Sequence, residues 1–544
     1  MKTQTDCNDV GAQGGSAPLG QLRRSTALSR FARDEEGGLL AWSLFTIIGI
    51  FAATGLGLSV QFYEVHRAHL QNTLDRAVLA ATDLDQTLDP EDVIADYVKR
   101  AGLEGALTDA SVENGINYRT SSAAAKVSMR TMFTVGQDRW DVEADSTAIE
   151  SITDVEISLV LDNSGSMGWN DDYRLNLLKP AAKSFIETVT RPVDGIDNGS
   201  VAVSIVPFST QVNAGPLLAG ELNFSNHHNY SHCARFGTND YNSTSIDPNT
   251  QLQRAGHFDI FTWDWPVDHE GVVCPFDESR HITPWSRDAE ALKAQIDAMW
   301  AGGNTSMDVA TKWGAALLDP EFQDVFDSLA EDEDSGVEEV VGSQPFDYER
   351  ENTLKVLVVM SDGQNTDEYR LKSSYRSGNS PVFLHTVTSG SGATEKRFSY
   401  YTNRSGTSAD YYSVREDRWR SSPDGGNAAD RLTWPELFNE MSVARYSRDI
   451  RGKALDTGWQ SNYNNTYTRV RANDKNTRTS AICTAARDAG IVVYTIGMDT
   501  YGQGDATLED CAGNSVNFFD VSAIEIDQAF AAIAQQINQL RLTQ

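Results

Sequence analysis

The sequence lacks the short motifs that mark several large classes of enzyme. It contains no Gly-x-Ser-x-Gly nucleophile elbow, no Gly-x-x-x-x-Gly-Lys-Ser/Thr phosphate loop and no His-Glu-x-x-His zinc motif. No cysteine stands in a recognisable nucleophile motif. We therefore expect no catalytic residues and no bound nucleotide, and we look for a binding function instead.

Basic residues are also scarce. The chain has 45 Lys and Arg against 77 Asp and Glu, a formal net charge of −32. Acidic and basic residues balance over residues 1–63, so the acidic excess lies in the rest of the chain. Such a surface repels phosphate backbones, which argues against a nucleic-acid partner and favours cations or basic protein surfaces.

Cysteine is rare and unevenly placed. Cys7 precedes the longest apolar segment, and Cys233, Cys274, Cys483 and Cys511 follow it. One odd thiol on one side and an even set on the other is expected when a membrane separates a reducing from an oxidising compartment. Four cysteines allow three pairings, of which chain proximity favours Cys233 with Cys274 and Cys483 with Cys511.

Charge is absent from Gly37 to Gln61. About 24 residues at about 1.5 Å per residue reach about 36 Å, which is enough to cross a bilayer. Four arginines precede this run, so we expect a cytoplasmic tail at 1–36, a membrane helix at 37–62 in the bacterial inner membrane, and a periplasmic remainder. A cleaved signal peptide and a prepilin-type signal are the alternatives.

Beyond the apolar run, the helical pattern continues with Leu70, Leu74, Ala77, Val78 and Ala81 on one face. A second helix and short strand-like stretches at 116–119, 125–134 and 140–149 follow. We expect an extended helix with a small α+β module over residues 63–150.

From Glu156 the chain shows apolar strands that end in oxygen-bearing side chains. The first ends in Asp162-Asn-Ser164-Gly-Ser166, a later loop holds Thr305, and a second strand ends in Ser361-Asp362-Gly363. Carboxylates and hydroxyls are the ligands that small hard cations prefer. A strand-to-helix turn capped by its own side chains is the alternative for the first loop alone.

Asp162, Ser164, Ser166, Thr305 and Asp362 together resemble the metal-ion-dependent adhesion site of a von Willebrand factor A (VWFA) domain. The resemblance implies bound Mg²⁺, with Mn²⁺ or Ca²⁺ as alternatives, ligated by the three hydroxyls and by the two aspartates directly or through water. It also implies that a protein partner supplies a carboxylate to the metal. Asp308 is expected to support the Thr305 loop.

Helices that alternate with fully apolar strands predict an α/β fold, with a doubly wound, mostly parallel sheet and helices on both faces. We place this domain at 151–544, with insertions at about 211–285 and 367–473. The second insertion, rich in Tyr, Arg, Ser and Gly, is equally compatible with a binding surface and with an irregular excursion. The first holds most of the histidines, and His228 and His232 leave a zinc site as a competing hypothesis.

The arrangement as a whole resembles the TadG-like proteins of tight-adherence (Flp) pilus-assembly systems. The segments that carry this resemblance are 74–81, 302–306, 313–320 and 539–544. It implies a membrane-anchored, non-enzymatic assembly factor whose partner is a pilus or pilus-assembly component. A surface adhesin and a regulatory subunit of an ATPase-coupled or metal-insertion machine are the alternatives.

Overall fold

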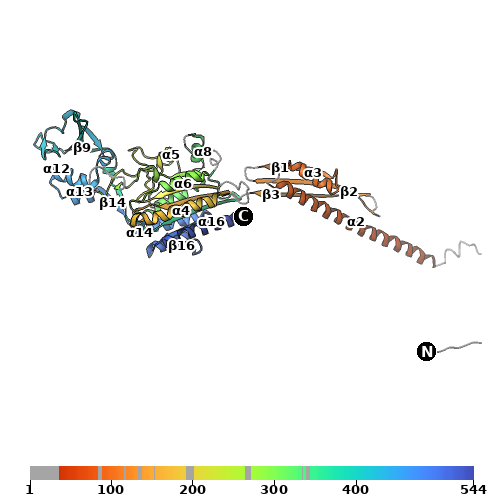
Figure 1. Ribbon diagram of the computed structural model, residues 1–544. Coiled ribbons are helices and arrows are strands. Elements are labelled where there is room, and N and C mark those ends of the chain that lie inside the picture. Colours follow the sequence, from red (N-terminus) through yellow and green to blue (C-terminus); the bar gives the residue numbers. More distant parts are fainter. Residues whose placement is uncertain are drawn as a thin grey trace, which may run out of the picture. The chain divides into compact units, whose positions relative to one another are not determined.

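The chain folds into two units, shown in a computed structural model (Figure 1). The structure describes residues 36–83, 88–114, 118–132, 138–151, 154–191, 201–263, 271–333, 335–338, 344–500 and 502–543. The first unit comprises Met1–Asn114 and Arg119–Glu150, and the second comprises Gly115–Tyr118 and Ser151–Gln544. The tail predicted at 1–36 lies outside the described residues except for Glu36.

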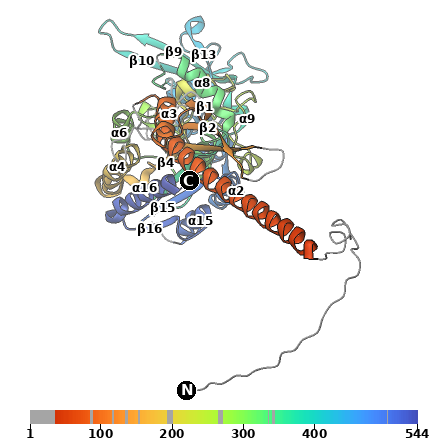
Figure 2. The ribbon, with the colours of Figure 1, turned by 90° about the vertical axis from the view of Figure 1, so that its right-hand side faces the viewer.

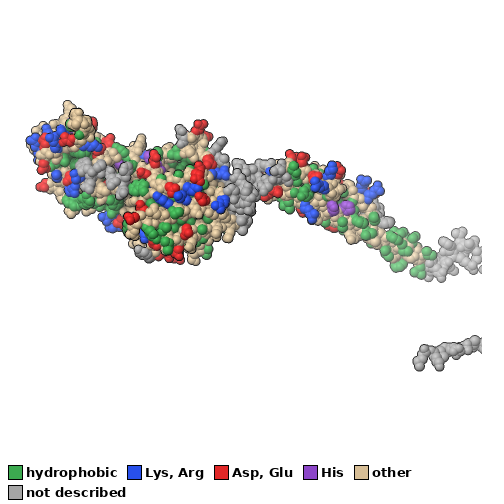
Figure 3. All heavy atoms as spheres, viewed as in Figure 1, with side chains coloured by type: hydrophobic (Ala, Val, Ile, Leu, Met, Phe, Trp, Pro, Cys, Tyr) green, Lys and Arg blue, Asp and Glu red, His purple; other side chains and the backbone are tan. Residues whose placement is uncertain are grey.

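A single helix, α2 (Glu36–Thr82), organises the first unit. Its N-terminal part carries exposed apolar side chains, which gather along it in Figure 3. Within the described residues, α2 alone is long and apolar enough to cross a membrane. The unit's other elements are α3 (Pro90–Arg100), β1 (Leu107–Asn114), β2 (Tyr118–Arg130) and β3 (Arg139–Ser151).

The C-terminal half of α2 packs against α3 and the three-stranded sheet β1-β2-β3. The five apolar residues predicted to share one helix face, from Leu70 to Ala81, are all buried in this core. The packing begins inside the uncharged run, because Gly55 and Ser59 are buried and the Met132 N–H donates to the Ser59 hydroxyl at 2.9 Å. The first two residues of the strand expected at 116–119 lie outside the described residues, and the last two belong to β2. β1 ends at Asn114 and β2 begins at Tyr118.

A six-stranded sheet in the order β16-β15-β7-β4-β5-β6 forms the centre of the second unit. Its strands are β4 (Asp154–Asp162), β5 (Val201–Phe208), β6 (Thr283–Ser286), β7 (Thr353–Ser361), β15 (Val492–Met498) and β16 (Phe518–Val521). All neighbours pair in parallel except β5 and β6, which are antiparallel. Counted along the sheet, this is the doubly wound order 3-2-1-4-5-6. The predicted fold class is therefore confirmed.

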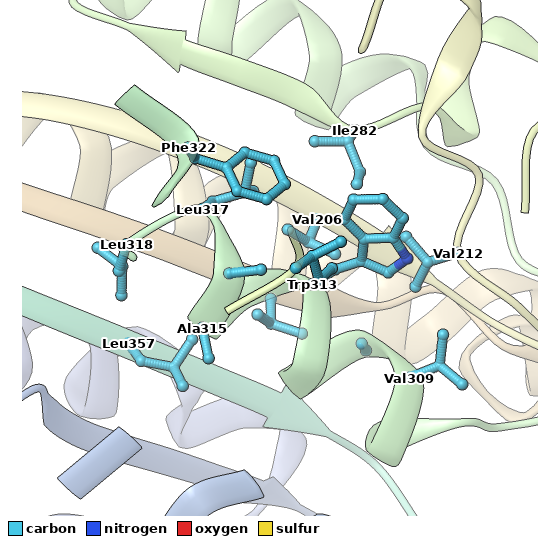
Figure 4. Close-up of a cluster of buried hydrophobic side chains, with 14 of the residues drawn as sticks. Val206, Val212, Ile282, Val309, Trp313, Ala315, Leu317, Leu318, Phe322 and Leu357 are labelled. Carbon is cyan, nitrogen blue, oxygen red and sulfur yellow. The ribbon is translucent and has the colours of Figure 1, made fainter. Parts of the chain in front are cut away.

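Helices cover both faces of this sheet, as the burial of β4 and β5 on both sides requires. One face is covered by α4 (Trp169–Thr190), α6 (Ala289–Ala298) and α16 (Ile526–Thr543). The other is covered by α7 (Met307–Ala316), α8 (Gln323–Glu331), α14 (Ala472–Asp488) and α15 (Gln503–Ala512). Figure 4 shows the indole of Trp313, on α7, beside Val206, Val212 and Ile282.

Both disulfides that chain proximity favours are present. Cys233 pairs with Cys274 inside the first insertion, and Cys483 on α14 pairs with Cys511 on α15. The first insertion has little regular structure apart from α5 (Gly215–Gly220) and short turns. These turns are η2 (Asn239–Asn242) and η4 (Glu278–Arg280). At the expected end of this insertion, near residue 285, β6 belongs to the main sheet.

The second insertion is a folded subdomain and not an irregular excursion. Its five-stranded sheet runs β12-β11-β10-β9-β13 and has its own hydrophobic core. Figure 2 shows β9, β10 and β13 side by side. The strands are β9 (Asn379–Thr388), β10 (Thr394–Tyr401), β11 (Tyr411–Ser413), β12 (Arg418–Arg420) and β13 (Asp430–Thr433). A ribbon of β8 (Glu368–Leu371) and β14 (Tyr467–Val470) forms its root.

Further short helices occur among the described residues. Within the second insertion they are α9 (Ser373–Arg376), η7 (Gly426–Ala428), α10 (Trp434–Glu440), α11 (Val443–Arg445), the π-helical η8 (Tyr446–Gly452), α12 (Lys453–Leu455) and α13 (Trp459–Thr466). Elsewhere they are η1 (Gly165–Gly168), η5 (Pro320–Phe322) and η9 (Ala523–Glu525).

Gly314 allows α7 to lie directly on the two central strands. A Cβ at this position would come within 2.6 Å of Val160 Cγ2 and 2.8 Å of Leu357 Cδ1.

We expect Gly314→Val to lower the free energy of unfolding by about 1–3 kcal/mol, the usual range for overpacking a core. Urea unfolding of the detergent-solubilised chain, followed by tryptophan fluorescence, measures this. Gly220→Val is the matched control, since nothing lies within 4 Å of a Cβ there. An equal loss in both variants would contradict the packing argument.

Candidate metal centre

The strand order places the two aspartates at the switch point of the sheet. β4 and β7 are adjacent and parallel, with Leu161 opposite Met360, so Asp162 and Asp362 leave the same edge side by side. The connection after β4 leads to α4, which covers one face of the sheet. The helices before and after β15, α14 and α15, cover the opposite face. Ligands of doubly wound sheets bind where the connections diverge in this way.

Asp162 is fully buried, and both of its oxygens accept hydrogen bonds. The Ser164 N–H donates to Oδ1 at 2.7 Å, and the Ser361 hydroxyl donates to Oδ2 at 2.6 Å. These bonds fold the loop after β4 back over the strand end. The carboxylate is therefore fixed by its two nearest loops.

Asp362 lies beside the serine pair. The Ser166 hydroxyl donates to Asp362 Oδ1 at 2.7 Å, and the Ser164 and Ser166 hydroxyl oxygens are 3.2 Å apart. The Arg174 guanidinium donates from Nη1 to Asp362 Oδ2 at 2.8 Å. Four of the five predicted residues thus form one continuous chain of hydrogen bonds.

The Thr305 loop is attached to the Asp-x-Ser-x-Ser loop through the backbone. The Gly165 N–H donates to Gly303 O at 2.9 Å, and the Gly302 N–H donates to Asn163 O at 3.0 Å. Gly303 has a φ of +86°, and a Cβ there would lie 2.6 Å from Thr210 Oγ1, so the approach requires glycine. Ser166, Thr305 and Asp362 consequently line one cavity of about 430 Å³.

The cavity is rimmed by residues with unusual backbone geometry. Trp169 is 65% exposed at its edge, and the next three residues, 170–172, all have positive φ. Such conformations cost energy for non-glycine residues and occur at functional sites. This turn directs α4 so that Arg174 reaches the cavity.

Burial and mutual repulsion make the two carboxylates easier to protonate. Burial and the neighbouring Asp362 charge raise the pKa of Asp162 to about 7, although the bonds from Ser361 and Ser164 oppose this. Burial also raises the pKa of Asp362, against the lowering effect of Ser166 and Arg174. A divalent cation would relieve this repulsion, and the all-oxygen donor set suits Mg²⁺, Mn²⁺ or Ca²⁺. The residues therefore fit the implied metal.

Asp308 contacts the Thr305 loop through Lys475. The Lys475 ammonium donates to Thr305 O at 2.7 Å, to Ser306 Oγ at 2.6 Å and to Thr366 O at 2.8 Å. Asp308, fully buried, lies 3.9 Å from this ammonium and 3.6 Å from Arg478 Nη1. The buried ion pairs thus link α7 and α14 beneath the loop.

Several residues of the site escaped the sequence motifs. Ser361 was visible in the sequence as part of Ser361-Asp362-Gly363, although its bond to Asp162 was not. Lys475 lies 170 residues from Thr305, 169 from Ser306 and 109 from Thr366, which it contacts. Arg174 and Asp499 are joined by a bond of 3.2 Å from Nε to Oδ2 across 325 residues. No local pattern indicates such a pair.

The zinc alternative finds no support in the part of the chain that the structure describes. The segment holding His228 and His232 is not helical there, and no group of three His, Cys, Asp or Glu side chains is placed to hold a metal. His228 Nε2 lies 2.8 Å from Ala255 O instead. His269 lies outside the described residues.

Comparison with known families identifies the N-terminal helix. Residues 37–83 match a family model described as "Putative Flp pilus-assembly TadE/G-like". The family predicted from the sequence is thus confirmed for this segment. No curated protein matches the chain.

Some solved structures resemble the chain at low identity. The VWF domain of the type V pili tip protein Mfa5 from Porphyromonas gingivalis is 12% identical, with a TM-score of 0.33 over 72% of this chain and 97% of that one. PilB minor pilin from Streptococcus sanguinis is 12% identical, with a TM-score of 0.28 over 80% and 78%. Proximal thread matrix protein 1 from the mussel byssus, with a zinc-occupied MIDAS motif, is 10% identical, with a TM-score of 0.16 over 70% and 96%. At these TM-scores the likenesses carry no argument, and the fold rests on the strand order.

The raised pKa of Asp162 predicts a pH-dependent stability in the absence of metal. A carboxylate whose pKa is raised on folding stabilises the fold below its unfolded pKa, and this contribution is lost as the pH rises towards about 7. In EDTA we therefore expect Asp162→Asn to unfold at a higher temperature than the unmodified chain at pH 8, with the difference shrinking towards pH 5. Thermal unfolding at both pH values measures it.

Asp247→Asn serves as the control, because hydrogen bonds from Thr250 and Asn249 lower the pKa of that exposed carboxyl. It should bring no gain at pH 8. If Asp162→Asn were less stable than the unmodified chain at pH 8, the repulsion between the two carboxylates would not be the dominant effect.

Proposed function

Because the TadE/G-like segment at 37–83 precedes an A-type domain, we propose that this chain is a membrane-anchored, non-enzymatic pilus-assembly factor. Its A domain binds a protein partner through Mg²⁺ held by Asp162, Ser164, Ser166, Thr305 and Asp362. The observation that carries the proposal is the pair of buried carboxylates, which are joined through the N–H and hydroxyl of Ser164 and the hydroxyl of Ser166 beside a cavity that Ser166, Thr305 and Asp362 line.

The donor set determines what the centre can do. Ser164, Ser166 and Thr305 offer neutral hydroxyl oxygens, and both oxygens of each aspartate accept hydrogen bonds from the protein or line the cavity. Because the three hydroxyl ligands carry no charge, a bound Mg²⁺ would supply an electrophilic position for a carboxylate. The bond to Asp362 keeps the Ser166 hydroxyl in place, and the bond from Lys475 to Thr305 O holds the Thr305 loop.

The surroundings of the site support a protein as the partner. Both insertions leave the sheet at the edge where the metal centre lies, since they follow β5 and the loop after β7. The second insertion carries more basic than acidic side chains, although the chain as a whole is strongly acidic. Its arginines lie over aromatic rings, as Arg404 does over Trp419 at 4.2 Å. Arginine and aromatic residues are enriched in protein interfaces, and a basic face would favour an acidic pilus component.

The anchor supports a location at the inner membrane. α2 is a candidate membrane anchor, and four arginines precede its apolar run. Both disulfides lie after it, as an oxidising periplasm would require. The A domain is accordingly periplasmic in this proposal.

Removing one hydroxyl ligand tests the metal-bridged contact. We expect Thr305→Ala, or EDTA, to lower the amount of pilus component that copurifies with the full chain from crosslinked cells by at least about tenfold. Thr305→Ser keeps the hydroxyl and should behave as the unmodified chain does. Copurification that is indifferent to both EDTA and Thr305→Ala would refute the proposal.

Reporter fusions test the orientation. A reporter that is active only in the periplasm should be active when fused after Gln544, and one that is active only in the cytoplasm should be silent. The opposite pattern would favour the regulatory subunit of a cytoplasmic ATPase-coupled machine.

A further inference from the structure

Arg174 places its guanidinium directly against the carboxylate of a predicted metal ligand, Asp362. Its Nη1 donates to Asp362 Oδ2 at 2.8 Å and lies 3.4 Å from Ser166 O, and its Nε donates to Asp499 Oδ2 at 3.2 Å. The side chain is 18% exposed and lines the cavity. A fixed positive charge therefore sits where a divalent cation is expected to bind nearby.

We propose that Arg174 sets both the metal affinity and the electrophilicity of this centre by neutralising Asp362. The inference rests on the proposed function, because it concerns the same site. It assigns to Arg174 a role that the five motif residues do not have. In this role the arginine weakens metal binding and strengthens the subsequent capture of a carboxylate.

Hydrogen bonding gives the first reason. Asp362 Oδ1 accepts from the Ser166 hydroxyl, and Oδ2 accepts from Arg174. With both oxygens engaged, the carboxylate is held in place to orient Ser166 and would reach a metal through water instead of directly. Without the arginine, Oδ2 would be free to ligate the metal directly, so the metal would bind more tightly and lose electrophilicity.

Charge gives the second reason. Asp162, Asp362 and Asp499 supply three carboxylates, and Arg174 compensates one of them. Adding a divalent cation then gives a site without net charge, to which an anionic partner can add. Without Arg174 the same metal would leave a net negative site, which binds cations better and carboxylates worse.

A purely structural role for Arg174 is the competing explanation. In that role the arginine ties α4 to the loop after β15 through Asp499, whose Oδ1 also accepts from the Ala523 N–H at 3.1 Å. Loss of a structural tie would loosen the site and weaken metal binding. Only the proposed role predicts a gain in affinity, so the direction of the change separates the two.

Manganese binding to the detergent-solubilised full chain tests the proposal. We expect Arg174→Gln to bind Mn²⁺ at least about tenfold more tightly than the unmodified chain in a calorimetric titration. Arg174→Lys keeps the charge and should remain within about threefold. Acetate, as a carboxylate probe, should displace water from bound Mn²⁺ at higher concentration in Arg174→Gln, as measured by water-proton relaxation.

The outcomes are distinguishable. Unchanged or weaker Mn²⁺ binding by folded Arg174→Gln, with normal binding by the unmodified chain, would overturn the role of Arg174 alone. Binding by neither chain, or binding that persists unchanged in Asp162→Ala, would overturn the proposed metal centre itself. Binding by Arg174→Gln but not by the unmodified chain would support the inference in its strongest form.

Discussion

The repulsion between two buried carboxylates is the constraint around which the second unit is arranged. Asp162 and Asp362 stand at the ends of adjacent parallel strands, where neither can move away without disturbing the sheet. Burial removes the water that would otherwise screen them, so the protein must supply compensation through hydroxyls, backbone N–H groups and one guanidinium. A divalent cation completes that compensation in the proposed function.

The same arrangement explains why the two large insertions surround the site. In a doubly wound sheet the connections that follow the strands emerge at the edge where the aspartates lie. Both large insertions use this edge, and residues beside their bases contact the site. Thr210, just before the first insertion, bonds to the Thr305 loop, and Lys475, just after the second, donates to Thr305 O. A partner that reaches the metal would therefore also meet the insertions, which can encode its identity.

The sequence predicted the parts of this structure that are local or apolar throughout. β4, β5 and β7 are mostly apolar, and the Asp162 and Asp362 loops follow strand ends, so the convergence of these two loops is a consequence of parallel topology. Thr305 lies between α6 and α7 and was found by its motif alone. The polar β1, the four-residue edge strand β6 and the short strands of the second insertion have no comparable signal. Arg174, Asp499 and Lys475 were missed for a related reason, because tertiary contacts between residues far apart in the chain create their roles.

Anomalous diffraction from crystals of this chain soaked in Mn²⁺ tests the account most directly. It predicts one strong peak at about 2.1–2.3 Å from the hydroxyl oxygens of Ser164, Ser166 and Thr305, with Arg174 still bonded to Asp362. The absence of a peak among these oxygens, or a peak held instead by the histidines of the first insertion, would contradict it.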